Sequence, residues 1–296
     1  MAENVNTFIY DRQVNRAAMI RLYEKRVTGK IEVIFDGHSI RLDNLIKKSG
    51  NKKEFTDLLD KEISKTYKEA YNTSSRSLLD LASDQLSYTT QTLQQAVSDI
   101  WDVRKPQRRI SEEIVLRNPL YKNTTLNTGW GGIAITEKKR IESMIRSGLD
   151  KGQTVDEIAT TVRKSNILDI SRNNARALVI TGITSVHAQV DQEVYLANEK
   201  ALQGWQYVAV LDSRTTALCA ERDGNIYPIS DFAHLPPAHY RCRSTTLPVV
   251  KSWDDLGKLE GVSQIRRRNL QNLTPKQVQY YDGLTPLKES YNACLS

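Results

Sequence analysis

The stretch ARALVITGITSVHAQVDQEVY, residues 175–195, decides the fold. Apolar or small residues recur in it every three or four positions, which is the spacing of one helix face. That stripe consists of Ala175, Leu178, Gly182, Val186, Val190 and Val194. We therefore expect a long helix over 171–199. A glycine inside a helix costs about 1 kcal/mol relative to alanine, so Gly182 predicts close packing against a neighbour.

The sequence before this stretch is mostly of helical type. We expect a helix over 8–27, and two further long helices on either side of the polar residues 72–75, paired with each other as an antiparallel hairpin. The segment IEVIFDGHSIRL (31–42) predicts a small β-hairpin instead, because its β-branched residues flank Asp36-Gly37.

The segment 102–135 is less regular and predicts a hinge or arm, with LNTGWGG (126–132) as a glycine-rich loop. Helical spacing returns at Thr136 and ends at Lys151-Gly152. The sequence TVDE (154–157) is a capping box, in which the Thr and Glu side chains satisfy the first free N–H groups of a helix.

After the long helix the pattern becomes that of strands. WQYVAVLD (205–212) alternates, Asp223-Gly224 is a turn signal, and STTLPVV (244–250) predicts a second strand that Pro248 favours at an edge. We expect an α+β fold that is predominantly α-helical, with long N-terminal helices followed by a small mixed C-terminal module with a few short strands. In the tail, Thr274-Pro275 predicts the start of a short helix.

The composition indicates a globular chain of about two domains at 296 residues. The formal net charge of +7 permits a polyanionic partner such as DNA. Three cysteines are too few for a disulfide scaffold and fit a reducing cytosol. No apolar run approaches the ~20 residues of a membrane span, and the first sixteen residues predict no secretory signal.

One dense constellation of chemistry-bearing residues lies within 211–249. Cys219, His239 and Cys242 have a spacing that allows zinc chelation, and a closed zinc site needs four ligands. The fourth ligand would come from a further group: Asp212, Asp223, His234 or a water. Two other interpretations stay open. The cysteines form a buried pair, reduced or disulfide-linked, or Cys219 and His239 form a nucleophilic dyad.

Other residues of this constellation have structural roles in our interpretation: Asp212, Arg214, Thr215, Asp223, Gly224, Pro237 and Arg243. Asp212 and Thr215 are expected to hydrogen-bond within their own turn. Arg241 and Arg243 are expected to pair with Asp212 or Asp223. The four histidines include no second cluster, and no P-loop, dinucleotide fingerprint, HExxH or GxSxG occurs.

Basic residues form short runs that could contact DNA phosphates: Arg104, Lys105, Arg108 and Arg109, and then Arg266, Arg267 and Arg268. A further run, 138–140, is interpreted as a solvated face. No aromatic residues interleave with these runs, so any double-stranded DNA contact is expected to be salt-dependent and independent of sequence.

Residues from about 136 to 253 resemble the Mu F-like minor head proteins of tailed phages. The resemblance rests on GLDKGQTVDEIA (148–159), the long helix, and the order D-x-R-T-x₃-C, D-G, P-P-x-H-x-x-C-R between 212 and 243. A closing KSWDDLG follows at 251–257. The family often has Arg-Thr in the long helix, where this chain has Ile180-Thr181.

The resemblance implies a virion protein present in few copies near the portal vertex, and in the host cytoplasm during assembly. Its implied partners are the portal and capsid proteins and the genome, and its implied role is in head assembly, DNA packaging or DNA delivery, without enzymatic activity. We divide the chain into a variable, partner-binding helical region (1–135), a Mu F-like module (136–253) and a tail (254–296). Alternative functions are a metal-dependent nuclease or delivered toxin centred on Cys219, His239 and Cys242, and a non-specific DNA-binding protein.

Overall fold

The computed structural model describes residues 5–48, 52–97, 101–106 and 109–251. Its elements in chain order are α1 (Val5–Lys48), α2 (Lys52–Val97), α3 (Ile110–Leu116), α4 (Leu126–Asp150), α5 (Val155–Lys164), α6 (Ile167–Ala197), a short 3-10 turn η1 (Glu199–Ala201), β1 (Leu202–Val208), α7 (Ala217–Arg222), β2 (Ile226–Tyr227) and β3 (Thr245–Val250). The expected α+β class with long N-terminal helices and a small C-terminal sheet is confirmed.

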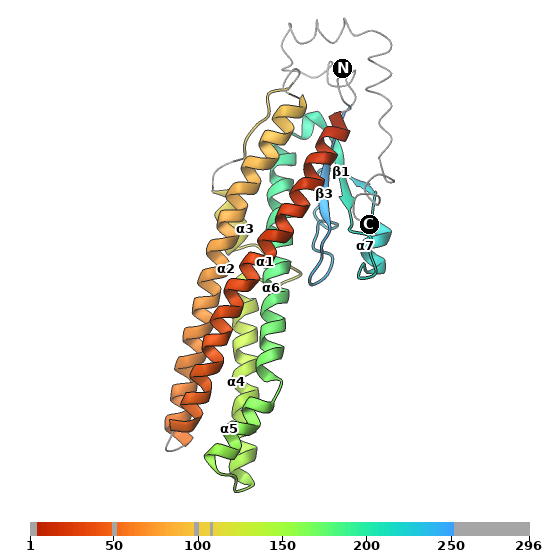
Figure 1. The fold of residues 1–296 in the computed structure, drawn as a ribbon. Coiled ribbons are helices and arrows are strands. Elements are labelled where there is room, and N and C mark those ends of the chain that lie inside the picture. Colours follow the sequence, from red (N-terminus) through yellow and green to blue (C-terminus); the bar gives the residue numbers. More distant parts are fainter. Residues whose placement is uncertain (1–4, 49–51, 98–100, 107–108, 252–296) are drawn as a thin grey trace, which may run out of the picture.

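The long helices lie side by side as an elongated bundle, and the small sheet lies beside one end of it, next to α1 and α6 (Figure 1). Helix α5 lies at the opposite end. The sheet has the order β2-β1-β3, and both of its strand pairs are antiparallel. Pro248 therefore lies in an edge strand, as its missing N–H donor predicts.

Helix α6 is the central element of the bundle. All six residues of its expected stripe are buried. A Cβ added at Gly182 would lie 3.2 Å from Leu78 Cδ1 and 3.3 Å from Leu120 Cδ1, so the expected close packing at this glycine is confirmed. The missing side chain allows α2 and the segment before α4 to approach the helix backbone.

The β-hairpin expected at 31–42 is wrong, because these residues belong to α1. Buried residues continue through the segment at helical spacing: Val27, Ile31, Phe35, His38, Leu42 and Ile46. Asp36-Gly37 locally favours a turn. Burial of this continuous face stabilises the helix by a larger amount, so the segment is helical. Asp36 instead forms an ion pair with Arg172 of α6 at 2.7 Å.

The helix break expected at 72–75 is also wrong, since α2 runs continuously through it. The hydroxyl of buried Ser74 donates to the carbonyl of Ala70 at 2.8 Å and accepts from Trp130 Nε1 at 2.9 Å. Its polar group is thus satisfied inside the helix rather than in a turn. The two helices expected on either side of residues 72–75 are therefore one helix, and it packs against α1.

The glycine-rich loop expected at 126–132 is instead the beginning of α4. Thr125 and Thr128 form a reciprocal capping box that starts this helix. A Cβ at Gly129 would lie 2.6 Å from Leu178 Cδ1, so this glycine brings α4 close to α6. The capping box at 154–157 and the end of α4 before Gly152 are as expected.

A second hydrophobic core lies between the sheet and the ends of three long helices. It contains Tyr207 of β1 and Tyr195 of α6, together with Ile9, Leu93 and Trp101 from the N-terminal half of the chain. Side chains on both sides of position 135 therefore build the core that supports the C-terminal module.

A charged cluster is buried in the bundle where α1, α2 and α4 meet. His38 is fully buried, with Nδ1 3.0 Å from Glu62 Oε1 and Nε2 2.7 Å from Glu137 Oε1. Tyr67 donates to the second oxygen of Glu137 at 2.7 Å, and Arg41 donates to Glu62 at 2.7 Å. Sequence reasoning missed this cluster because its members come from three separate helices.

Both ring nitrogens of His38 face carboxylates, and only the imidazolium has two N–H donors. The two glutamates raise the pKa of His38, although burial alone lowers it. Hydrogen bonds from His38, Arg41 and Thr66 lower the pKa of Glu62 to about 2 against the opposing effect of burial. The raised pKa of His38 and the lowered pKa of Glu62 both favour an ion pair between these two side chains.

We expect His38→Gln to lower the free energy of unfolding by about 3 kcal/mol near pH 6, because it leaves the buried Glu137 carboxylate without a cation. A histidine whose pKa is raised by folding stabilises the fold fully below its unfolded value of about 6.5. The difference between wild type and variant is expected to shrink as the pH rises through the folded-state pKa.

Urea unfolding between pH 6 and 9 measures this difference. His234→Gln, at a partly exposed histidine paired with Asp231, is the control. A destabilisation that stays the same across the pH range would contradict a charged His38.

Candidate functional site

The turn after β1 is organised by the carboxylate of Asp212. Its Oδ1 accepts from the N–H of Arg214 at 2.9 Å, and its own N–H donates to the Thr215 hydroxyl at 2.8 Å. Arg243 reaches the same carboxylate with two hydrogen bonds, both of 2.6 Å. This guanidinium holds the pKa of Asp212 well below its usual range. The paired side chains join the turn to the segment that leads into β3.

The second turn of the site closes the segment after α7. Asp223 is buried and its Oδ1 accepts from the N–H of Ala209 at 2.9 Å. Gly224 has φ +78°, and its N–H donates to the carbonyl of Tyr207 at 2.8 Å. A left-handed backbone at this position favours glycine. Arg243 pairs with Asp212, as expected, whereas Arg241 donates to the backbone carbonyl of Asn173 at 2.8 Å.

The segment before β3 is fixed to α6 by two threonines. The Thr184 hydroxyl donates to the carbonyl of Cys242 at 2.8 Å, and the Thr181 hydroxyl accepts from the N–H of Arg241 at 3.0 Å. The Pro236-Pro237 bond is cis in this segment. Thr181 is the second residue of the pair Ile180-Thr181. The family often has Arg-Thr at this place, so the chain differs at the first residue and keeps the threonine.

These contacts bring Cys219, His239 and Cys242 together. Cys219 lies on α7, whose first turn is capped by the Thr216 hydroxyl, and the other two lie in the segment before β3. Cys219 Sγ is 3.2 Å from His239 Nε2 and 3.8 Å from Cys242 Sγ. Both cysteines are buried and reduced, at 3% and 0% exposure, while His239 is half-buried.

The two thiols differ in acidity because they share a hydrogen bond. Donation from Cys242 lowers the pKa of Cys219 to about 4, with further help from the hydroxyls of Thr216 and Tyr207. The same interaction, together with burial, raises the pKa of Cys242. Cys219 is therefore the more acidic of the two thiols, and it faces His239. A buried thiolate next to an imidazole suits metal ligation better than attack on a substrate, which needs access to the sulfur.

Of the basic residues expected to contact DNA, three lie in the described part of the chain and four lie outside it. Arg104, Lys105 and Arg109 are exposed in the connection between α2 and α3. The backbone on this connection is held by Asn198, whose side chain accepts from the N–H of Arg104 at 2.8 Å and donates to its carbonyl at 3.0 Å. Four expected residues lie outside the described part of the chain: Arg108, Arg266, Arg267 and Arg268. The helix start expected at Thr274-Pro275 also lies outside it.

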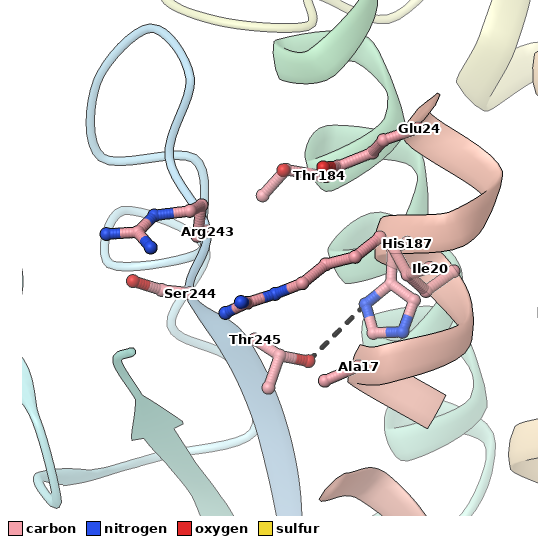
Figure 2. Close-up of a pocket in the computed structure, with 9 residues that line it drawn as sticks. Ala17, Ile20, Glu24, Thr184, His187, Arg243, Ser244 and Thr245 are labelled. Carbon is pink, nitrogen blue, oxygen red and sulfur yellow. Dashed lines mark hydrogen bonds between the residues drawn. The ribbon is translucent and has the colours of Figure 1, made fainter. Parts of the chain in front are cut away.

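A small pocket between α1, α6 and β3 adjoins the site, and sequence reasoning did not indicate it. Glu24 of α1 and His187 of α6 line it with Ser244, Thr245 and Arg243 (Figure 2). His187 is 5% exposed, and its Nδ1 lies 3.4 Å from the Thr245 hydroxyl. Burial lowers the pKa of His187, so it is neutral. Its Nε2 has no hydrogen-bond partner among the described residues.

Glu24 makes this pocket sensitive to pH. Burial raises the pKa of its carboxyl to about 7, although Arg21 and Arg243 oppose the shift. Only part of this pocket could have been predicted from the sequence. His187 and Thr184 are one turn apart on a helix whose opposite face is apolar, but the partner residues on α1 are far away along the chain.

We expect Glu24→Gln to raise the free energy of unfolding at pH 8 and to change it little at pH 4. A carboxyl whose folded-state pKa is raised disfavours the fold as the pH rises from about 4.5 through 7, and the amide removes that penalty. The gain is about 1–2 kcal/mol, less than the full pKa shift implies because the side chain is partly exposed.

Thermal or urea unfolding at the two pH values measures the gain. Glu69→Gln, at an exposed position of α2, is the matched control. An equal effect of Glu24→Gln at both pH values would show that ionisation of this carboxyl plays no part.

The region that contains this site matches a known protein family. Residues 139–247 match the family model described as phage Mu protein F like protein. The match runs from within α4 to within β3, so it includes α6, both turns and the cysteine–histidine cluster. No curated protein and no solved structure matched the chain. The resemblance drawn from the motifs is thereby confirmed: residues 139–247 of this chain are similar to the phage Mu protein F like family.

Proposed function

We propose that this protein is a minor structural protein of a tailed-phage head, bound to the portal and capsid proteins and close to the genome. In this role it aids head assembly, DNA packaging or DNA delivery, acts without catalytic turnover, and resides in the virion after assembly in the host cytoplasm. The observation that carries the proposal is the family match over residues 139–247. Within the described residues, no helix is both long and apolar enough to span a bilayer.

The nuclease or toxin hypothesis has less support. Its candidate residues are Cys219, His239 and Cys242, and both sulfurs are enclosed in the second hydrophobic core with Tyr207. A substrate as large as DNA cannot reach sulfur atoms in that position without a rearrangement of the module. The buried cluster is therefore better suited to holding the module together.

The N-terminal helices supply a surface for a protein partner. Met19, Leu22, Val33 and Ile40 of α1 are 55%, 71%, 71% and 64% exposed. They are separated by 3, 11 and 7 residues, which are near whole numbers of helical turns, so they share one face of α1. This face lies outside the family match. We propose that it contacts the portal protein, which makes partner choice a property of the variable region.

The first test is co-purification with procapsids and with the portal protein of the same phage. We expect wild type to be retained by the portal and the double variant Leu22→Ser, Val33→Ser to lose at least about tenfold in retention. Both side chains are largely exposed, so we expect the melting temperature of the variant to be unchanged.

Ile135→Ser is the matched control, because Ile135 is 57% exposed on α4. Its retention by the portal is expected to equal that of wild type. Absence of the wild-type chain from procapsids would refute the proposed function, whereas normal retention of the double variant would refute only the assignment of α1.

The genome contact is assigned to the connection between α2 and α3, where Arg104, Lys105 and Arg109 are exposed. Replacing all three with alanine is expected to weaken binding to double-stranded DNA of any sequence. Each lost phosphate contact reduces the slope of log K against log salt by about 0.9, so the triple variant is expected to lose roughly 2–3.

The control removes equal charge from the far part of α2, with Lys61, Lys65 and Lys68 replaced by alanine. Lys65 is 32 residues before the end of α2, which is about 48 Å along a helix. An unchanged salt slope in the first variant, or an equal decrease in both, would contradict a DNA contact at the connection.

A further inference from the structure

We propose that Cys219 Sγ, His239 Nε2 and Cys242 Sγ bind one zinc ion, with a water molecule in the fourth position. This inference does not depend on the proposed role in the phage head. These three ligand atoms lie within 4.8 Å of one another, and no other group of histidine, cysteine and acidic residues in the described part of the chain has this arrangement.

The separations of the ligand atoms are close to those around a tetrahedral zinc ion. Two thiolates at about 2.3 Å from a tetrahedral zinc are about 3.8 Å apart, and a thiolate and an imidazole nitrogen are about 3.6 Å apart. The two sulfur atoms are 3.8 Å apart, and Cys219 Sγ lies 3.2 Å from His239 Nε2. The first distance fits and the second is short. The third separation, from Cys242 Sγ to His239 Nε2, is at most 4.8 Å. Rotation of the half-buried His239 side chain can adjust the last two.

The tautomer of His239 is set for ligation. Its Nδ1 lies 2.8 Å from the backbone carbonyl of Tyr240, which can only accept a hydrogen bond. Nδ1 therefore carries the proton, and in the neutral ring the lone pair of Nε2 points at Cys219. Metal-binding histidines are oriented in this way by a carbonyl or carboxylate on the other ring nitrogen.

The surroundings of the sulfur atoms support thiolates. The Tyr207 hydroxyl lies 3.4 Å from Cys219 Sγ and 3.8 Å from Cys242 Sγ, and can donate to either. Two thiolates, a neutral imidazole and a divalent cation sum to zero charge, which suits a site whose cysteines are 3% and 0% exposed. A disulfide requires sulfur atoms about 2.05 Å apart, so the observed pair is not bonded.

The protein groups considered for the fourth position are engaged elsewhere. Asp212 is held by Arg243 and Asp223 accepts from the backbone of Ala209. His234 stacks on Tyr227 and does not belong to the group whose ligand atoms lie within 4.8 Å of one another. Three protein ligands leave one position open, and a half-buried His239 admits water to it. Soft thiolate ligands with imidazole favour zinc over calcium or magnesium.

The metal would add a second link between two segments that the Asp212–Arg243 pair already joins. Cys219 is on the six-residue helix α7, and His239 and Cys242 are in the irregular segment before β3. Their sheet has three strands, of which β2 has only two residues. Such a small module buries little apolar surface of its own, and a metal commonly stabilises modules of this kind.

The test begins with the full-length wild-type chain, purified under reducing conditions from a zinc-supplemented culture. We expect elemental analysis to find about one zinc per chain. After chelation, titration with cobalt(II) alone is expected to give the thiolate charge-transfer and d–d bands of a tetrahedral site.

Two variants probe the ligands. His239→Gln keeps both thiols and alters a half-buried side chain, and Cys242→Ser removes a buried ligand; both are expected to lose at least about tenfold in zinc affinity. His234→Gln is one matched control. Cys294→Ser is the other, at the third cysteine of the sequence, which lies outside the described residues. Both variants are expected to keep the zinc. Circular dichroism of each variant checks that it has folded.

Failure of the wild-type chain to bind zinc or cobalt at equimolar concentration would overturn the proposal, and this test requires no variant to fold. Full zinc affinity in a folded His239→Gln would remove that residue from the site. A Cys219–Cys242 disulfide in protein purified under reducing conditions would also overturn the proposal.

Discussion

The structure depends on the burial of a single helix. Almost every residue of α6 from Thr181 to Tyr195 is buried, because α1, α2 and α4 cover it along the bundle and β3 covers its later turns. A helix enclosed in this way needs small residues where neighbours approach, which explains Gly182. Several of its buried polar groups find partners on neighbouring elements. Thr184 hydrogen-bonds Cys242, and Asp191 accepts from Gln85 Nε2 at 2.7 Å.

These polar contacts position the cysteine–histidine cluster. Thr181 and Thr184 fix the segment that carries His239 and Cys242, while the Asp212–Arg243 pair fixes the turn that precedes α7 and Cys219. None of these groups touches the sulfur atoms, yet together they set the separation of the two chain segments. The short strands supply only a few backbone hydrogen bonds, so the side-chain contacts to α6 define the geometry of the module.

The family-matched region and the N-terminal helices are physically interdependent. Ile9, Leu93 and Trp101 contribute to the core beneath the sheet, and His38 of α1 joins Glu62 of α2 to Glu137 of α4. Residues outside the match therefore stabilise the region inside it. The outward face of α1 does not contribute to that stabilisation, since its apolar side chains are exposed. This difference between buried and outward faces allows a shared module to be combined with a partner surface particular to each protein.

The sequence by itself determined the α+β class, the stripe of α6, the capping box at 154–157, the edge strand with Pro248 and the family, because periodicity and motif order are local properties. It did not determine that 31–42 and 126–132 are helical. Their Asp-Gly and Gly-rich signals favour turns locally, and burial against α2 and α6 outweighs them. Only the tertiary structure assembled His38 with Glu62 and Glu137, and Glu24 with His187. These groups are far apart along the chain, and their proximity follows from helix packing that no local pattern encodes.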